Sequence, residues 1–94
     1  MYVVLLRFSG ARAKALELME AHKAWIQRGF DDGVFVMTGT LQPNAGGLVV
    51  AMSTSRTELE GRVSADPFVV EGVVRAEILD VVPGRVDERL KWLA

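Results

Sequence analysis

Residues 34–53, VFVMTGTLQPNAGGLVVAMS, carry the clearest signal of fold in the chain. Two runs of aliphatic and β-branched residues, Val34 to Thr38 and Leu48 to Ser53, are separated by the turn residues Pro43 to Gly47. Proline presets one backbone angle of a turn, and asparagine and glycine tolerate the left-handed angles that a chain reversal needs. The pattern therefore predicts two strands that pair as a hairpin.

A strand and a helix are predicted before this hairpin. Residues 2–8, YVVLLRF, are β-branched and aliphatic and end at the turn signal Ser9-Gly10. Residues 12–29 are good helix formers, and Gly29 together with the Asp31-Asp32-Gly33 run supplies a stop. The chain thus enters the hairpin from a strand–helix unit.

A helix and a strand are also predicted after the hairpin. Ser55 and Glu58 have the S-x-x-E spacing that satisfies free N–H groups at a helix start, and this helix should run to about Ala65. A fourth strand is expected from Val73 to Val82, where Pro83-Gly84 ends it. The element order is therefore β-α-β-β-α-β.

This order predicts a single α+β domain over residues 1–94. It matches the split β-α-β plan, in which both helices cover one face of a four-stranded antiparallel sheet. With 94 residues, the chain is too short for a second independent core. The core should span about residues 2–82, and apolar residues at helical spacing predict a short helix in the tail, residues 85–94.

Apolar side chains fall on both faces of the predicted sheet. In residues 2–8 they occupy alternate and intervening positions alike, and the hairpin strands repeat the pattern. Two short helices cover only one face, and soluble monomers rarely leave a large apolar face bare. We therefore expect a homodimer whose outer sheet faces pack together. RNA-recognition modules share this element order, but residues 47–51 carry no aromatic side chain for base stacking.

Composition argues against several classes of site and partner. The chain has no cysteine and one histidine, so thiolate chemistry and a metal site are not expected. Eleven basic and twelve acidic residues give a net charge of −1, without the basic surplus that nucleic-acid binding requires. The apolar runs are far shorter than the ~20 residues that span a membrane, and the N-terminus lacks an export signal. These features predict a cytoplasmic protein that binds neither nucleic acid nor membrane.

His22 is the first candidate for chemistry. At about 100° per residue, it falls in the middle of an apolar arc on the first helix. The arc contains Leu18, Met19, Trp25, Ile26 and Gly29. A ring that points at the sheet must be hydrogen-bonded or held neutral by desolvation, and either arrangement suits a catalytic base. The alternative is a core histidine whose hydrogen bonds are satisfied.

Asp66 is the second candidate. Aspartate followed by proline is what a helical turn prefers at its N-cap and first position, which favours a structural role. Asp66 also stands between the second helix and the fourth strand, where a carboxylate could reach a ring on the first helix. Both roles are compatible if one carboxylate oxygen caps the turn while the other orients the imidazole of His22.

Together these residues resemble the YCII-related (YciI-like) family. The resemblance covers roughly residues 2–82 and rests on the order and spacing of several weak motifs. These are His22, Gly39, Gly46-Gly47, Asp66-Pro67-Phe68 and Gly72-Val73. The resemblance implies a ferredoxin-like fold that assembles as a dimeric α/β barrel, with His22 and Asp66 as the active-site pair. Thr40 stands where many members carry proline, and the tail extends beyond the usual end.

The preferred hypothesis is an enzyme that moves a proton on a small ring or enol-type substrate, by elimination or isomerisation. His22 would be the general base and Asp66 would orient it. One activity known among family members is dehydrochlorination of a chlorinated hydroxyhydroquinone. No G-x-S-x-G, GxGxxG or Walker sequence is present, so no cofactor is expected. Thr38, Thr40 and Ser53 are candidate hydrogen-bonding groups near the pocket, or ordinary strand residues.

Two alternatives stay open at this point. A non-catalytic dimeric module could bind a small ligand, or serve as an accessory subunit, with the same cavity and no chemistry. A cofactor-free monooxygenase, an activity found among related barrels, would consume oxygen with a phenolic substrate. Turnover and oxygen uptake therefore distinguish the three readings.

Overall fold

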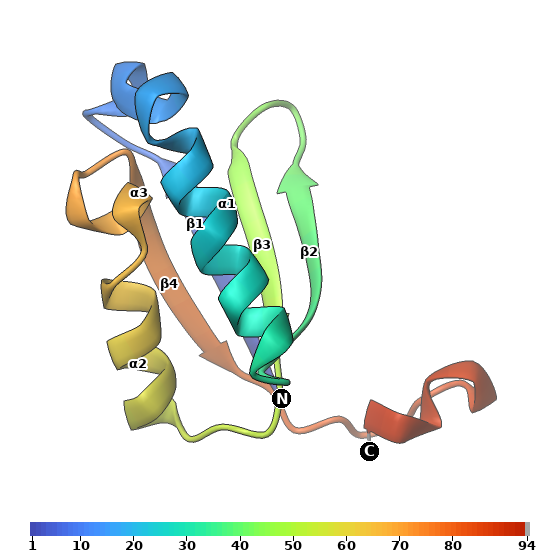
Figure 1. The fold of residues 1–94 in the computed structure, drawn as a ribbon. Coiled ribbons are helices and arrows are strands. Elements are labelled where there is room, and N and C mark those ends of the chain that lie inside the picture. The colour runs from blue at the N-terminus through green and yellow to red at the C-terminus, as the bar shows by residue number, and fades with distance from the viewer. Residues whose placement is uncertain (94) are drawn as a thin grey trace.

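Four strands form one antiparallel sheet in the order β2-β3-β1-β4 (Figure 1). The strands are β1 (Tyr2–Phe8), β2 (Phe35–Leu41), β3 (Gly46–Ala51) and β4 (Val74–Asp80). The computed structural model describes residues 1–93. The predicted α+β arrangement, with its central hairpin and ferredoxin-like strand order, is confirmed.

The helices lie on one face of this sheet (Figure 1). They are η1 (Arg12–Lys14), α1 (Ala15–Asp31), α2 (Arg56–Ser64) and α3 (Pro67–Val70), and η2 (Glu88–Leu93) follows in the tail. The Ser55 side chain accepts a hydrogen bond from the amide of Glu58, so the predicted cap of α2 is confirmed. Among the described residues, no helix is both long and apolar enough to cross a bilayer.

The first helix ends within the predicted stop, Gly29 with Asp31-Asp32-Gly33, and α1 runs to Asp31, two residues past Gly29. Gly29 is buried, and a Cβ atom there would collide with the ring of Phe35 on β2. The absence of a side chain lets α1 approach the sheet closely. The helix stops before Gly33, whose φ of +73° lies in the left-handed region that favours glycine.

A bulge in β2 decides which hairpin side chains face the helices. The pairing shifts between Phe35 and Met37, so β2 has one extra residue relative to β3. Phe35 lies opposite Ala51, and after the bulge Thr38 lies opposite Val49. Since Ala51 and Val49 are buried on the helix side, the bulge turns Thr38 to that side as well.

The core fills the space between the sheet and the helices. β1 and β3 contribute alternate residues, which are opposite one another in the register, such as Val4 and Val49. Trp25 on α1 is also buried there, and its indole N–H donates to the backbone oxygen of Arg62 at 2.9 Å. This bond ties α1 to the end of α2.

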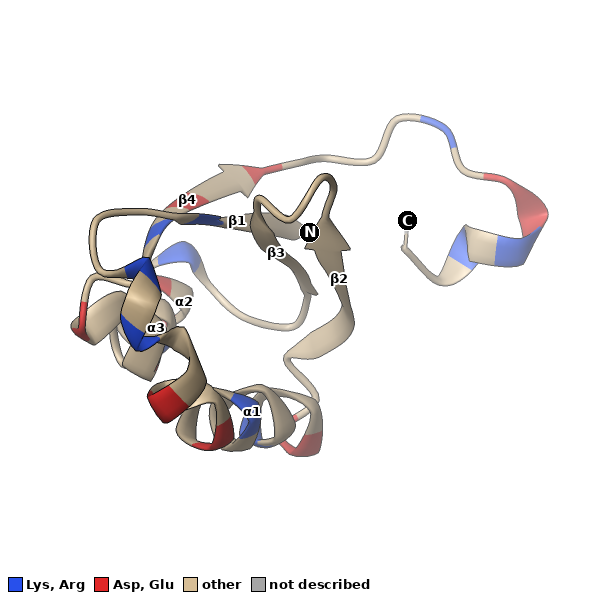
Figure 2. Cartoon of the chain, turned by 90° about the horizontal axis from the view of Figure 1, so that it is seen from above, with Lys and Arg blue, Asp and Glu red and all other residues tan. Residues whose placement is uncertain are grey.

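No helix covers the opposite side of the sheet, which we call the outer face (Figure 2). Its apolar residues include Val3, Leu5, Met37, Leu48, Val50 and Leu79, and the charged residues Arg7, Arg75 and Glu77 lie on its β1–β4 side. The strands β2 and β3 contain no charged residue, so the β2–β3 half of this face is uncharged. An ion pair of 2.9 Å between Arg7 and Glu77 lies at the β1–β4 side of the sheet.

The tail leaves the domain after β4. Val81 is anchored by two backbone hydrogen bonds to Met1, of 2.8 and 2.9 Å. The following segment and η2 lie apart from the sheet and the other helices in both views (Figures 1 and 2). The predicted tail helix is therefore a short 3₁₀ segment, Glu88–Leu93, with a kink at Leu90.

Candidate active site

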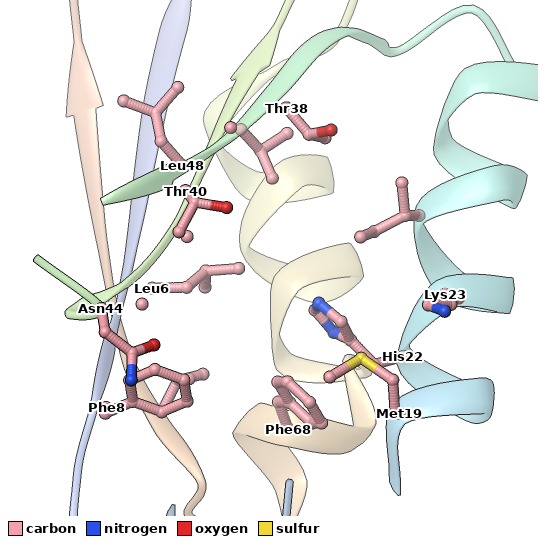
Figure 3. A pocket seen from close by; sticks show the side chains of 16 residues that line it. Leu6, Phe8, Met19, His22, Lys23, Thr38, Thr40, Asn44, Leu48 and Phe68 are labelled. Carbon is pink, nitrogen blue, oxygen red and sulfur yellow. The ribbon is translucent and has the colours of Figure 1, made fainter. Parts of the chain in front are cut away.

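A cavity of about 440 Å³ lies between α1 and the helix side of the β2–β3 hairpin (Figure 3). α1 supplies Met19, His22, Lys23 and Ile26 to one wall, and the hairpin supplies Thr38 and Thr40 to the other. Phe68, from α3, lies beside the imidazole of His22. Apolar side chains form most of the remaining lining.

His22 and Asp66 are brought into direct contact, although they are 44 residues apart. Nδ1 of His22 lies 2.7 Å from Oδ1 of Asp66. An ionised carboxylate only accepts hydrogen bonds, so the ring nitrogen is the donor. The second ring nitrogen, Nε2, then carries the lone pair and has no hydrogen bond to any residue that the structure describes.

Asp66 is wholly buried, and it caps α3 as well as contacting the ring. Its Oδ1 accepts a hydrogen bond of 3.0 Å from the amide of Phe68, with Pro67 in the first turn. We expected the two carboxylate oxygens to divide these tasks, but the same oxygen accepts both bonds. One oxygen can do so because it has two lone pairs. Oδ2 has no partner within residues 1–93.

Two aromatic rings fix the plane of the imidazole. Phe68 stacks on His22 with centroids 4.0 Å apart and an interplanar angle of 2°. Trp25 lies 5.8 Å from the same ring at 23°. The side chain of His22 is 12% exposed, so the ring is shielded on its faces and open only in part toward the cavity. Phe68 therefore holds both members of the pair, with its amide on Asp66 and its ring on His22.

Thr38 and Thr40 line the cavity, whereas Ser53 does not. Both threonines face α1 because the bulge in β2 comes before them. Ser53, expected near the pocket, is exposed beyond the end of β3 and has a φ of 56°. Its backbone belongs to the link between β3 and α2, on the far side of the hairpin from the turn.

Sequence reasoning missed two polar residues of the lining, Lys23 and Asn44. Lys23 follows His22 on α1, and its ammonium lies 4.0 Å from Glu20, a loose contact at the surface. Asn44 is in the hairpin turn, with a φ of 48°. Lys23 carries the only fixed charge on the described lining, and no carboxylate lies there. The cavity therefore suits a neutral or anionic ligand.

The chain can be compared with known proteins in sequence, in fold and by family. No curated protein matches the chain in sequence. Among solved structures, the chain resembles 5-chloro-2-hydroxyhydroquinone dehydrochlorinase (TftG) from Burkholderia phenoliruptrix AC1100, in complex with 2,5-dihydroxybenzoquinone. The TM-score is 0.67 at 18% sequence identity, over 89% of this chain and 96% of that one, which supports the fold.

The third comparison is with models of protein families. The model of the YCII-related domain matches residues 1–82, which include every strand, α1, α2, α3 and the His22–Asp66 pair. The matched region ends where the tail begins. The chain therefore belongs to the YCII-related domain family.

Proposed function

We propose that this chain is an enzyme that transfers a proton on a small ring or enol-type substrate, with His22 as general base. The observation that carries the proposal is the hydrogen bond between Nδ1 of His22 and the buried Asp66, which leaves Nε2 available on the cavity side. A base whose tautomer is fixed by a carboxylate is the arrangement that proton abstraction requires.

The chemistry in the cavity is an elimination or an isomerisation. Nε2 removes a proton from a substrate carbon, and the electrons of the C–H bond form a new π bond. In an elimination, a leaving group departs from the adjacent carbon with its bonding electrons. In an isomerisation, His22 returns the proton to a different substrate atom. The imidazolium formed in between is stabilised by Asp66, whose Oδ1 lies 2.7 Å away.

The cavity supports a small oxygenated ring as the substrate. A volume of about 440 Å³ lies at the lower end of the range for small-ligand pockets. Apolar walls suit the faces of a ring, while Thr38 and Thr40, across the cavity from His22, offer hydroxyl groups to its oxygens. The structural neighbour acts on a chlorinated hydroxyhydroquinone and was solved with a dihydroxybenzoquinone, which is the same class of molecule.

The test is a turnover screen of hydroxylated and halogenated quinols, quinones and enol lactones with four proteins. They are the wild type, His22→Gln, Asp66→Asn and the control Ser53→Ala, whose side chain lies outside the cavity. Turnover by the wild type and the control, with losses of about 10²–10⁴-fold in His22→Gln, supports the proposal. All four proteins should keep the same circular dichroism spectrum.

Two outcomes would contradict the proposal, and each would favour a different function. Ligand binding without turnover in any protein would identify a non-catalytic binding module. Oxygen uptake in step with phenol consumption would identify a cofactor-free monooxygenase.

We also infer a homodimer in which the outer faces of two sheets pack together. The β2–β3 half of the outer face is apolar and no helix covers it, whereas the β1–β4 half also carries charged residues. A charge introduced at Val50, in the middle of the face, should abolish the dimer without unfolding the domain. Sedimentation equilibrium of Val50→Lys and of the wild type decides this point.

A further inference from the structure

The tail has apolar side chains that its own domain does not cover. We call residues 82–93 the C-terminal arm. Val82 is 87% exposed, Trp92 57% and Leu90 45%. Exposed large apolar residues in a group mark a contact surface more often than single ones do. Tryptophan is also the residue type most enriched among the side chains that dominate binding energy.

The end of the arm has local order of its own. The carboxylate of Asp87 accepts hydrogen bonds from the backbone and the side chain of Arg89, at 3.0 and 2.9 Å. The hydrogen bond from the Arg89 side chain, and to a lesser extent the one from its backbone, lower the pKa of Asp87 below its ordinary value. They hold the start of η2 as a turn, so Leu90 and Trp92 are presented by a formed segment rather than by a random chain.

The arm projects on the side of the sheet away from the helices. Figure 2 shows the helices on one side of the sheet and the segment after β4 on the other side, and Figure 1 shows that this segment lies beyond the strand ends next to the N-terminus. The hydrogen bonds between Val81 and Met1 fix its point of departure beside β1. The arm is therefore on the side of the outer face but beyond the strand ends, where it can contact a partner that covers this face.

The outer face alone is a small interface. Four strands about 4.8 Å apart and about seven residues long give it a footprint of roughly 450 Å². Stable interfaces bury about 800 Å² from each partner. The apolar arm is the other uncovered surface on this side, and in a two-fold dimer the arm contact occurs twice, once for each arm.

We propose that the C-terminal arm clasps the second copy of this chain, with Trp92, Leu90 and Val82 packed against the partner that covers the outer face. The proposal rests on the homodimer inferred above. The occupant is a second copy because the arm and the uncovered apolar face are on the same side of one molecule. Except for Val82, the arm lies outside the region that matches the family model, so Leu90 and Trp92 belong to a feature of this chain beyond the matched domain.

The experiment compares three full-length proteins by sedimentation equilibrium: the wild type, Trp92→Ser and the control Lys91→Ala. Trp92 is exposed in the single chain, so its replacement leaves the fold unchanged. We expect Trp92→Ser to raise the dimer dissociation constant at least about tenfold, as loss of a central interface residue does. Lys91→Ala, on the same segment, should leave it within about twofold of the wild type.

Fluorescence quenching by iodide gives a second readout on the wild type. The chain has two tryptophans, and Trp25 is buried in the core, so quenching reports Trp92. Quenching should fall as the protein concentration rises through the dissociation constant.

The outcomes distinguish failure of the proposed arm contact from failure of the inferred homodimer. A dimer whose dissociation constant is unchanged by Trp92→Ser, with Trp92 quenched equally at all concentrations, overturns the clasp and leaves the sheet-to-sheet dimer standing. A wild type that stays monomeric up to millimolar concentration overturns both inferences.

Discussion

The two faces of the sheet are built from neighbouring residues of the same strands, yet only one of them holds a candidate site. Val49 is buried under the helices, and Val50, the next residue, belongs to the uncovered outer face. α1, α2 and α3 cover the inner face over β1 and β4 but leave a cavity over the hairpin (Figure 1). The candidate site thus lies where a face is partly covered, whereas the fully uncovered face is suited to a partner.

The sharpest test of this contrast is one substitution at two adjacent positions. Val49→Lys places a charge in the core and should abolish cooperative unfolding, because a buried unpaired charge costs several kcal/mol. At a protein concentration where the wild type is monomeric, Val50→Lys should unfold cooperatively within about 1 kcal/mol of the wild type, since its side chain points away from the core. Urea denaturation of both variants checks this. Equal destabilisation would mean that the two faces are not distinct.

A second test concerns the close contact between Gly29 on α1 and Phe35 on β2. Gly29→Ala forces a methyl group against the ring of Phe35 and should destabilise the fold by about 1–3 kcal/mol. This loss runs against the usual gain of helix propensity from glycine to alanine. Thermal denaturation measures it, with Gly61→Ala as the control, because a Cβ at Gly61 on α2 meets no atom within 4 Å. A stabilised Gly29→Ala would contradict the close approach of α1 to β2.

The polar wall of the cavity gives a smaller effect on activity. Thr38→Val and Thr40→Val keep the shape of each side chain and remove one hydroxyl. Loss of one hydrogen bond to the substrate should lower kcat/KM by about 2- to 10-fold, with the unfolding free energy nearly unchanged. Steady-state kinetics on the substrate found in the screen measures this. Ser53→Ala should keep full activity, and a comparable loss there would place the substrate elsewhere.

The smallest effect on stability is expected at the ion pair between β1 and β4. The ion pair between Arg7 and Glu77 is more than half exposed on both sides. Glu77→Gln should therefore change the unfolding free energy by less than about 1 kcal/mol, and salt should reduce the difference further. Urea denaturation at low and high ionic strength tests this. A larger loss that salt does not screen would mean that a partner buries the pair.

Local chemistry in the sequence predicted much of the fold. β1 covers residues 2–8 as expected, and α2 and α3 begin at the caps that Ser55 and Asp66 provide. These features were predictable because a cap or a strand pattern is a property of adjacent residues. His22 and Asp66 were proposed from helix periodicity, position along the chain and family resemblance.

Features that depend on how one element meets another were not predicted. The bulge in β2, the contact between Gly29 and Phe35, and the displacement of Ser53 from the cavity all depend on the register and distance of separate elements. The same holds for the stacking of Phe68 on His22, since residues 46 positions apart reveal no angle between their rings.

The element order, the starts of α2 and α3 and the excess of apolar residues on both sheet faces could be predicted from the sequence, because each follows from local backbone preference or side-chain alternation. Tertiary structure alone decided that one oxygen of Asp66 serves both His22 and Phe68, that two threonines face the cavity, and that the arm stands on the side of the bare face. The physical reason is that hydrogen bonds and packing act over a few ångströms in space, and distance along the chain does not specify distance in space.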